Sequence, residues 1–495
     1  MNIDTKRNVV IVGAGLAGLS IGAILAKDRE KYNVTVYEKT SVIGGRATCK
    51  RVRDYQLDNG IHALRGGNDN PVVKILEMVG KKIDFAIKNS EGIIPTVYRN
   101  GKIATAPYTT SSLLSYPFLS VIEKIQLIRF VRKATGEQPD RLDNTSISAW
   151  LKELGLDKNQ NLMDHLKMFI SIAFYCEPNF DIMSAGELVR FFQKYPYDTG
   201  YPIGGWRQII DKLVAVIEDN QGKIITNAKV EGIVLQGDEG SRSLSSSSSS
   251  SSPSSVSGII LSGKNGSGEL SKRGEEKDQI VSADIVILNV PLKEIVKLII
   301  RTTKRDNNIN ATTITSSIIS TRIPLYNYET SAGIVLDIAV SKKVLTGKNY
   351  DTIINFEPTA IIRVSTKYDK TLAPSGQDLI TAWMPIKRSS KEDKNYVEDK
   401  FLKLEKIVED IVLSRTPHDH QILYKRRMVF DNVIGTYPVI GQSQKDRPRV
   451  KFGQIENLYL VGDAVNAPGI GGSSNTAFSS ALLCAEDIKK NISRN

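Results

Sequence analysis

The sequence predicts an α/β fold, and three observations lead to that prediction. An apolar run over residues 9–12 enters a glycine-rich turn and a helix-like stretch, and a second apolar run follows over 34–37. This order is typical of a βαβ unit with parallel strands. The chain also ends on a strand, a glycine-rich turn and a helix, over 458–488. Its length of 495 residues, with 41% hydrophobic and 24% charged residues, is typical of a globular protein of about two or three domains.

The turn after the first strand carries the spacing Gly13-x-Gly15-x-x-Gly18. Gly13 allows the tight turn, Gly15 lets the backbone approach a pyrophosphate, and Gly18 lets the helix pack closely on the strand. The helix N-terminus offers free N–H groups and a positive dipole end to the phosphates. Glu38 follows at about the distance expected for an acid that accepts hydrogen bonds from the ribose hydroxyls and repels a 2′-phosphate. These residues predict a Rossmann-type site for FAD or NAD rather than NADP.

A signal peptide or a membrane helix is the competing interpretation of the same segment. Residues 9–26 carry no charge and follow Lys6 and Arg7. Gly18 and Gly22 add the spacing at which membrane helices pack closely. However, glycines interrupt the run, and it leads at once into a strand and an acid. We therefore expect a nucleotide-binding unit and a cytoplasmic protein.

Charge, cysteine and histidine restrict the classes of function. The net charge of +12 comes from dispersed residues without an aromatic and basic binding module, so no nucleic acid partner is expected. An anionic membrane surface or an anionic cofactor explains the charge equally well. The cysteines Cys49, Cys176 and Cys484 form no metal or dithiol spacing, and His418 and His420 lack metal-ligand partners nearby. We expect no metal site.

The region between the two nucleotide-type units is predicted to be helical at first and strand-rich later. A serine-rich stretch at about 240–257 predicts a disordered insertion, and both it and the polar stretch 264–278 are predicted to be hairpin loops between paired strands. The predicted helices lie within 108–170, including 113–134 and 146–156, and over 396–412; the predicted strands lie at 223–237, 256–263 and 279–292 and within 317–384.

Two further motifs lead to a family. Gly44-Gly45-Arg46 follows the second strand closely, and bare backbone beside a fixed cation suits a turn that approaches a phosphate. Together with the first-turn glycines, Glu38 and the C-terminal Leu460-Val461-Gly462-Asp463, this segment resembles the superfamily of flavin-dependent amine oxidases and phytoene desaturases. The resemblance extends over residues 8–485 and implies FAD as the cofactor.

The resemblance also implies the positions that contact FAD. The segment Asp58 to His62 is similar to the one beside the isoalloxazine ring, and Val230 is implied to contact adenine through its backbone. His62 is the one candidate for a catalytic residue, and a structural, hydrogen-bonded histidine is the alternative. The implied FAD contacts are Gly13, Gly15, Leu16, Ala17, Gly18, Glu38, Lys39, Gly44, Gly45, Arg46, Gly60, Ile61, His62, Val230, Gly462, Asp463, Gly471 and Gly472.

The implied architecture is an α/β fold with a discontinuous Rossmann-type FAD-binding domain and an α+β substrate domain. The FAD-binding domain is expected to comprise residues 1–90, 200–295 and 431–495. The substrate domain is expected to comprise residues 91–199 and 296–430.

The motifs at 200–207 and 462–481 favour the phytoene desaturase branch, and hence an oxidoreductase acting on an apolar isoprenoid or carotenoid-type substrate. Hydride would pass between a substrate carbon and flavin N5, with oxygen or a quinone as the second acceptor. Two alternatives stay open. A flavin amine oxidase needs an aromatic cage, with Trp206, Trp383 and Tyr437 as candidates, and a prenyl-group escort protein of similar fold would bind without catalysis. The basic amphipathic stretch 113–134 either packs on a core or lies on a membrane.

Overall fold

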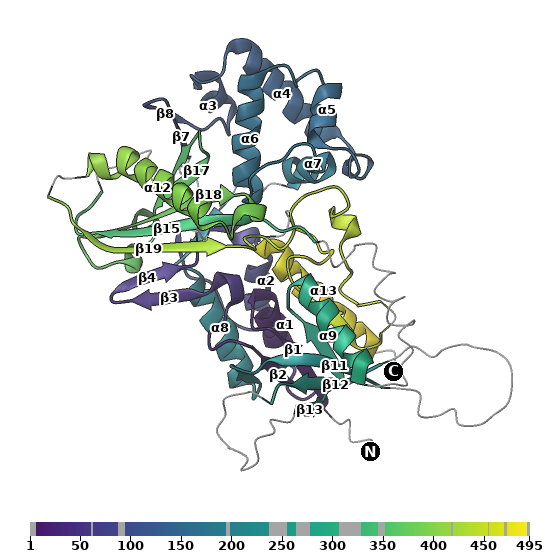
Figure 1. Ribbon diagram of the computed structural model, residues 1–495. Helices are drawn as coiled ribbons and strands as arrows, with labels where there is room; N and C mark the ends of the chain where they lie inside the picture. The colour runs from purple at the N-terminus through teal and green to yellow at the C-terminus, as the bar shows by residue number, and fades with distance from the viewer. Residues whose placement is uncertain are drawn as a thin grey trace, which may run out of the picture.

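The computed structural model describes residues 6–60, 63–87, 95–194, 199–236, 255–263, 278–305, 328–344, 352–416, 419–453, 455–469 and 473–492. A parallel sheet with its helices lies at the bottom of Figure 1. A larger sheet crosses the middle of the molecule, and the helices between residues 110 and 194 lie at the top. Both described ends of the chain lie beside the parallel sheet.

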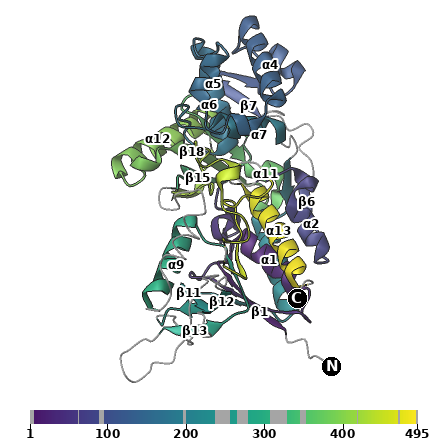
Figure 2. The same cartoon turned by 90° about the vertical axis from the view of Figure 1, so that its right-hand side faces the viewer.

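Five described strands form the parallel sheet in the order β10–β2–β1–β14–β20. Their apolar runs are buried because the sheet is covered on both faces. Helices α1 and α13 lie on one side, and α9 with β11 and β12 lies on the other (Figure 2). The elements are β1 (Arg7–Val12), α1 (Leu16–Ala26), β2 (Tyr32–Tyr37), α8 (Trp206–Asp219), β10 (Lys223–Ile225), β14 (Ile285–Leu288), α9 (Leu292–Arg305), β20 (Leu458–Leu460) and α13 (Ser474–Ile492).

Residues 9–26, for which a membrane helix was the competing interpretation, form a strand, a turn and a helix of 11 residues. Within the part of the chain that the structure describes, no helix is both long and apolar enough to cross a membrane.

The region predicted as three strands contains five, and they belong to two sheets. Residues 223–237 divide at Asn227, whose positive φ of 53° ends β10 before β11 (Val230–Gln236) begins. Residues 279–292 divide likewise into β13 (Gln279–Ser282) and β14. The strands β11, β12 (Ser255–Leu261) and β13 pair antiparallel, which confirms the two predicted hairpins.

The serine-rich insertion is shorter at its C-terminal end than predicted, because Ser255 already belongs to β12. Residues 237–254, which carry most of the predicted disorder, lie outside the described residues.

The larger sheet has the order β19–β15–β18–β17–β16–β7–β8 among the described strands, and only the β16–β7 pair is parallel. Helix α12 packs against β15 and β18 and buries Phe401, Leu404 and Val408. The elements are β7 (Thr96–Arg99), β8 (Lys102–Thr105), β15 (Ala332–Val340), β16 (Thr352–Asn355), β17 (Ala360–Val364), α11 (Ser365–Tyr368), β18 (Asp378–Ile386), α12 (Lys394–Ile411) and β19 (Ile422–Phe430).

The helices at the top include α3 (Thr110–Ser115) and α4 (Val121–Gly136), so the single helix predicted over 113–134 is wrong. Pro117 disfavours helix in the residue before it, and Ser120 starts α4 with a capping box to Glu123. Phe130 and Ala134 of α4 are buried. The other elements are β3 (Cys49–Val52), β4 (Tyr55–Asp58), β5 (Leu64–Arg65), α2 (Pro71–Met78), β6 (Phe85–Ile87), α5 (Ile147–Glu153), α6 (Gln160–Phe174), α7 (Ala185–Lys194) and β9 (Thr199–Pro202), with short 3₁₀ turns.

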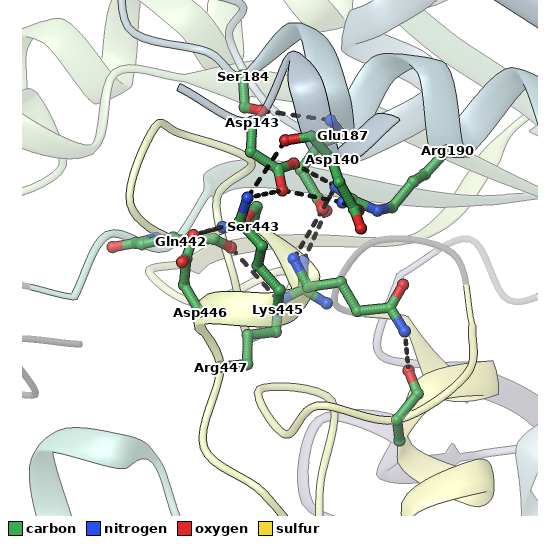
Figure 3. A network of polar contacts seen from close by, with 12 residues as sticks. Asp140, Asp143, Ser184, Glu187, Arg190, Gln442, Ser443, Lys445, Asp446 and Arg447 are labelled. Atoms are coloured by element: carbon green, nitrogen blue, oxygen red, sulfur yellow. Dashed lines mark hydrogen bonds and ion pairs between the residues drawn. The ribbon is translucent and has the colours of Figure 1, made fainter. Parts of the chain in front are cut away.

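A buried network of charges joins the helices at the top to the C-terminal segment (Figure 3). Arg190 of α7 binds Asp143 at 2.5 Å and Glu187 at 3.0 Å. Arg447 binds the other oxygen of Glu187 at 2.7 Å, and both side chains are almost fully buried. The N–H of Gln444 donates to Glu187, and its side-chain amide donates to the carbonyl of Ala467 at 3.0 Å. The network thus links the helices to the loop that follows β20.

Replacing Arg447 by Met should lower the free energy of unfolding by about 3–5 kcal/mol, because it removes one partner of a buried charge pair. Denaturation in urea measures the change. The control is Lys406→Met, which removes the exposed i,i+4 pair with Asp410 and should leave the free energy of unfolding nearly unchanged. Equal effects of the two substitutions would contradict a structural role for the network.

Candidate functional site

The first turn of the parallel sheet has no room for side chains. An ideal Cβ at Gly18 would lie 2.2 Å from the carbonyl oxygen of Gly13, so helix α1 can approach β1 only because position 18 is glycine. Gly13 has φ +101°, a conformation that favours glycine. Gly15 precedes α1 without a capping side chain. The N–H groups of Leu16 and Ala17 therefore begin a helix whose N-terminus suits a phosphate.

Asn289 also shapes this turn, and the sequence analysis missed it. It directly follows β14, and its side-chain amide donates to the carbonyl of Gly13 at 3.1 Å. A Cβ at Gly15 or Gly18 would lie 2.8 Å from that amide nitrogen. Gly462 lies on its other side, since a Cβ there would be 3.6 Å from the Asn289 Oδ1. The available signal was a polar residue directly after a buried parallel strand, a common place for ligand contacts.

Glu38 follows β2 and is buried, and both of its oxygens are hydrogen-bonded. Oε2 accepts from the N–H of Ala14 at 3.0 Å, and Oε1 accepts from the N–H and the hydroxyl of Thr40. Oε2 keeps a second lone pair, so the group is fixed in place and still able to accept from a ribose. The N–H of Ala228 donates to the carbonyl of Glu38, which places the predicted adenine contact, Val230, two residues further along the same segment. Lys39 is exposed.

The Gly44-Gly45-Arg46 segment contacts the first turn directly. The N–H of Gly44 donates to the carbonyl of Ala14 at 2.8 Å, and a Cβ at Gly45 would lie 3.2 Å from the Cα of Gly15. Arg46 reaches across the chain to Asp463, with 2.5 Å between Nη2 and Oδ1.

Asp463 does not cap the C-terminal helix, which was the alternative role for an aspartate after a strand and a glycine. Helix α13 starts later, at Ser474. The second oxygen of Asp463 accepts from the N–H of Gly435 at 2.6 Å. The sequence-predicted residues of the N-terminal and C-terminal units are thus brought together in space, although their roles toward FAD stay predictions.

The segment before Gly60 lies against the larger sheet. Arg426 of β19 donates to the carbonyl of Asp58 at 2.7 Å and to the side chain of Asn59 at 3.4 Å. Asp337 of β15 holds this guanidinium at 2.6 Å. Burial raises the pKa of Asp337, while Arg426 and the hydroxyl of Thr381 act to lower it. Arg426 therefore positions the segment that the family resemblance places beside the flavin ring.

A cavity lies between this segment, the turn before α8 and the larger sheet. Its polar wall includes Arg363, Asp369 and Thr381, and its apolar and aromatic wall includes Tyr201 and Tyr368. The lining residues are Gln56, Asp58, Gly60, Leu64, Tyr201, Pro202, Gly205, Trp206, Arg363, Ser365, Tyr368, Asp369, Leu372, Leu379 and Thr381. No histidine, lysine or cysteine is among these described lining residues.

The three aromatic candidates for an amine-oxidase cage each pack against a different neighbour. Trp206 stacks on Phe478, with ring centroids 6.3 Å apart. The hydroxyl of Tyr437 donates to the carbonyl of Glu177 at 2.8 Å, in a separate core. Trp383 belongs to β18, where it packs edge-on against Tyr175 at 5.5 Å. None of these contacts joins two of the three rings, so the cage stays a prediction.

Four of the predicted cofactor contacts lie outside the described residues: Ile61, His62, Gly471 and Gly472. Cys49 is described, and burial, together with the neighbouring Asp58, raises its pKa, so the thiol stays protonated at neutral pH. In the described part of the chain, no group of three or more His, Cys, Asp or Glu side chains is arranged to hold a metal ion.

The residues present fit FAD on three structural grounds. The first turn leaves backbone free at a helix N-terminus, a fixed carboxylate follows β2, and a cavity lies beyond Gly60. The strand order also places the carboxyl ends of β1 and β14 side by side at the point where the order reverses, which is where such sheets bind ligands.

Residues 16–489 match the model of the family described as flavin containing amine oxidoreductase. An uncharacterized protein of Methanocaldococcus jannaschii is 32% identical over 46% of this chain and 53% of its own length, so the match spans about half of that relative. Among solved structures, an oxidoreductase from Methanosarcina mazei is 19% identical with a TM-score of 0.70, over 97% of this chain and 100% of that one. Cyclohexylamine oxidase from Brevibacterium oxydans is 11% identical with a TM-score of 0.66, over 99% and 100%.

Replacing Glu38 by Gln should lower the affinity for FAD about tenfold or more, because the amide removes the charge that strengthens the hydrogen bonds to ribose. Its carbonyl can still accept from Ala14, which keeps the turn intact. Flavin retained through gel filtration, measured by absorbance, reports the change. The control is Glu30→Gln, whose side chain is 81% exposed. Unchanged retention in the Glu38 variant would contradict the ribose role.

Proposed function

We propose a function from one premise: the chain belongs to the family of flavin-containing amine oxidoreductases, and FAD is its cofactor. The proposal is that it is a dehydrogenase of the desaturase type, which removes hydrogen from a largely apolar, isoprenoid-like substrate. FAD, when bound, supplies the acceptor for the hydride. The protein's own contribution is then to hold the cofactor, to position the substrate and to exclude water.

The residues that line the cavity beside Gly60 are the main support for this proposal. The cavity walls include the side chains of Leu64, Tyr201, Tyr368 and Leu379, which suit an unsaturated apolar body. The two carboxylates of the cavity accept hydrogen bonds from the turn before α8. Asp369 accepts from the N–H of Gly204 at 2.5 Å, and Asp58 accepts from the N–H of Trp206 at 3.3 Å. Hydride transfer to a flavin needs few protein acids or bases, and the lining is consistent with that.

Amine oxidation is supported less well. None of the contacts of Trp206, Trp383 and Tyr437 joins two of these rings. The cavity lining carries one guanidinium, Arg363, and two carboxylates that already accept backbone N–H groups, so its charge does not single out an ammonium group.

Anaerobic mixing of the purified flavoprotein with a panel of compounds tests the proposal. We expect polyprenes or polyprenoic acids to bleach the flavin absorbance, and polyamines and alkylamines to leave it unchanged. The Glu38→Gln variant, stripped of flavin, is the blank. Bleaching by amines alone would overturn the desaturase proposal in favour of an amine oxidase. A preparation that binds no FAD would contradict any flavoenzyme.

The proposal extends to peripheral binding on an anionic membrane, which would deliver an apolar substrate. Large apolar side chains are exposed at the start of α4: Val121 is 72% exposed and Ile122 is 70% exposed. Ile125 continues this face, and the exposed Arg129 and Arg132 follow it at helical spacing. An apolar patch beside basic side chains suits the interface of an anionic bilayer.

Vesicle flotation tests the membrane contact. The double substitution Val121→Glu and Ile122→Glu should abolish flotation with vesicles of phosphatidylserine and phosphatidylcholine, because it places two negative charges against the bilayer. The control is Leu402→Glu, an apolar position on α12 that is 55% exposed. Flotation that survives the double substitution, or that is lost equally in the control, would contradict binding through α4.

A further inference from the structure

Arg363 is the charged residue of β17, a strand in the middle of the larger sheet whose other side chains are all buried. In register, it lies between Thr352 of β16 and Thr381 of β18. Its side chain reaches the cavity described above. An arginine at this place needs partners, because a guanidinium carries five N–H donors and none of them is easily buried alone.

The partners of Arg363 are neutral. Its Nε donates to the hydroxyl of Thr352 at 3.2 Å. The guanidinium carbon lies 5.1 Å from the ring centre of Tyr201 and 5.2 Å from that of Tyr368, and these two rings stack at 4.4 Å. Nη1 is buried, and no described residue accepts a hydrogen bond from it.

This arrangement differs from that of three other largely buried arginines. Arg190, Arg426 and Arg447 each contact a carboxylate within 2.7 Å. No carboxylate of the described residues pairs with Arg363. The carboxylates that share its cavity, Asp58 and Asp369, accept backbone N–H groups of the turn before α8. Arg363 is therefore a fixed cation in the cavity wall, and its buried Nη1 has no acceptor among the described residues.

Two guanidinium groups act on Tyr175, beside Arg363. Tyr175 lies at the C-terminal end of α6, and burial acts to raise the pKa of its hydroxyl. The guanidinium groups of Arg65 and Arg363 outweigh burial and lower that pKa. Arg65 is held by the carbonyls of Ala173 and Ile172, at 3.0 and 3.3 Å. Arg363 thus offers an unused donor to a ligand, within the described part of the site.

We propose that Arg363 binds an oxyanion of the substrate, so that the substrate of this cavity is an acid with an apolar or aromatic body. A carboxylate and a phosphate ester share the required chemistry: an oxygen acceptor with negative charge for Nη1, beside the faces of Tyr201 and Tyr368. Arginine suits both groups. The inference rests on the proposed function, because it treats the cavity as the place where the substrate lies beside the flavin.

Calorimetric titration of the holoprotein with matched probes tests this inference. Benzoate and benzamide have nearly the same shape and differ in charge. We expect wild-type protein to bind benzoate at least about tenfold more tightly than benzamide, since a hydrogen bond to a charged group contributes that much. Phenyl phosphate identifies the oxyanion: tighter binding than benzoate indicates a phosphate ester, and weaker binding indicates a carboxylate.

Variants of Arg363 test whether this residue causes the preference for benzoate. Arg363→Gln should abolish the preference for benzoate over benzamide, and Arg363→Lys should keep part of it. The control is Arg99→Gln, because Arg99 also lies over an aromatic ring, Phe356 at 4.1 Å, but pairs with Asn161 outside the cavity. Equal affinity of the wild type for the two probes, or a preference that survives Arg363→Gln, would overturn the inference.

A second readout separates this inference from the proposed function. The flavin content of each variant is measured by absorbance. If Arg363→Gln loses flavin while the benzoate preference remains in the protein that keeps it, Arg363 serves the cofactor and the inference is wrong. If no compound of the panel reduces the flavin but the benzoate preference depends on Arg363, the desaturase proposal fails and the oxyanion site stands.

Discussion

The contact between Asn289 and the first turn is the constraint on which the rest of the site depends. Its amide donates to Gly13, and it leaves no space for a Cβ at Gly15 or Gly18. The contact exists because β1 and β14 are neighbours in a parallel sheet, although they lie far apart in the sequence. Since β20 pairs with β14, the C-terminal Gly462 also comes to this point. A nucleotide site of this kind is assembled by strand order rather than by one motif.

The larger sheet also covers the end of the candidate cofactor site that lies beside Gly60. Arg426 donates to the backbone of Asp58 and to the side chain of Asn59, and Asp337 fixes Arg426. The network of Arg190, Glu187 and Arg447 links the helices at the top of the molecule to the loop after β20. Buried charges therefore tie together the parts of the chain that surround the cavity, and a change in one part is expected to reach the others.

Local motifs predicted the part of the structure that local chemistry determines. The glycine spacing, Glu38 and Gly44-Gly45-Arg46 predicted the βαβ unit and its turns, because glycine freedom and helix termini act over a few residues. The break before Ser120 was also visible as a capping box, Ser120 to Glu123, but the apolar periodicity on both sides obscured it. The division at Asn227 could have been inferred from its tendency toward positive φ.

The cavity could not be predicted in this way. Arg363 is the one charged residue in an otherwise apolar strand. Its role depends on Tyr201, on Tyr368 and on the lack of a described carboxylate partner, and distant parts of the chain determine all three. The aromatic cage of Trp206, Trp383 and Tyr437 could not be assigned for the same reason: a sequence gives residue types but not which of them meet. The sequence therefore predicted more of the fold than of the substrate.

A crystal structure of the holoprotein with benzoate tests the central claim most directly, since that claim joins the cofactor and the oxyanion at one cavity. We expect the isoalloxazine ring beside Gly60 and a carboxylate oxygen about 3 Å from Nη1 of Arg363. Benzoate bound elsewhere, with Arg363 instead contacting the flavin or a carboxylate of the protein, would contradict the account.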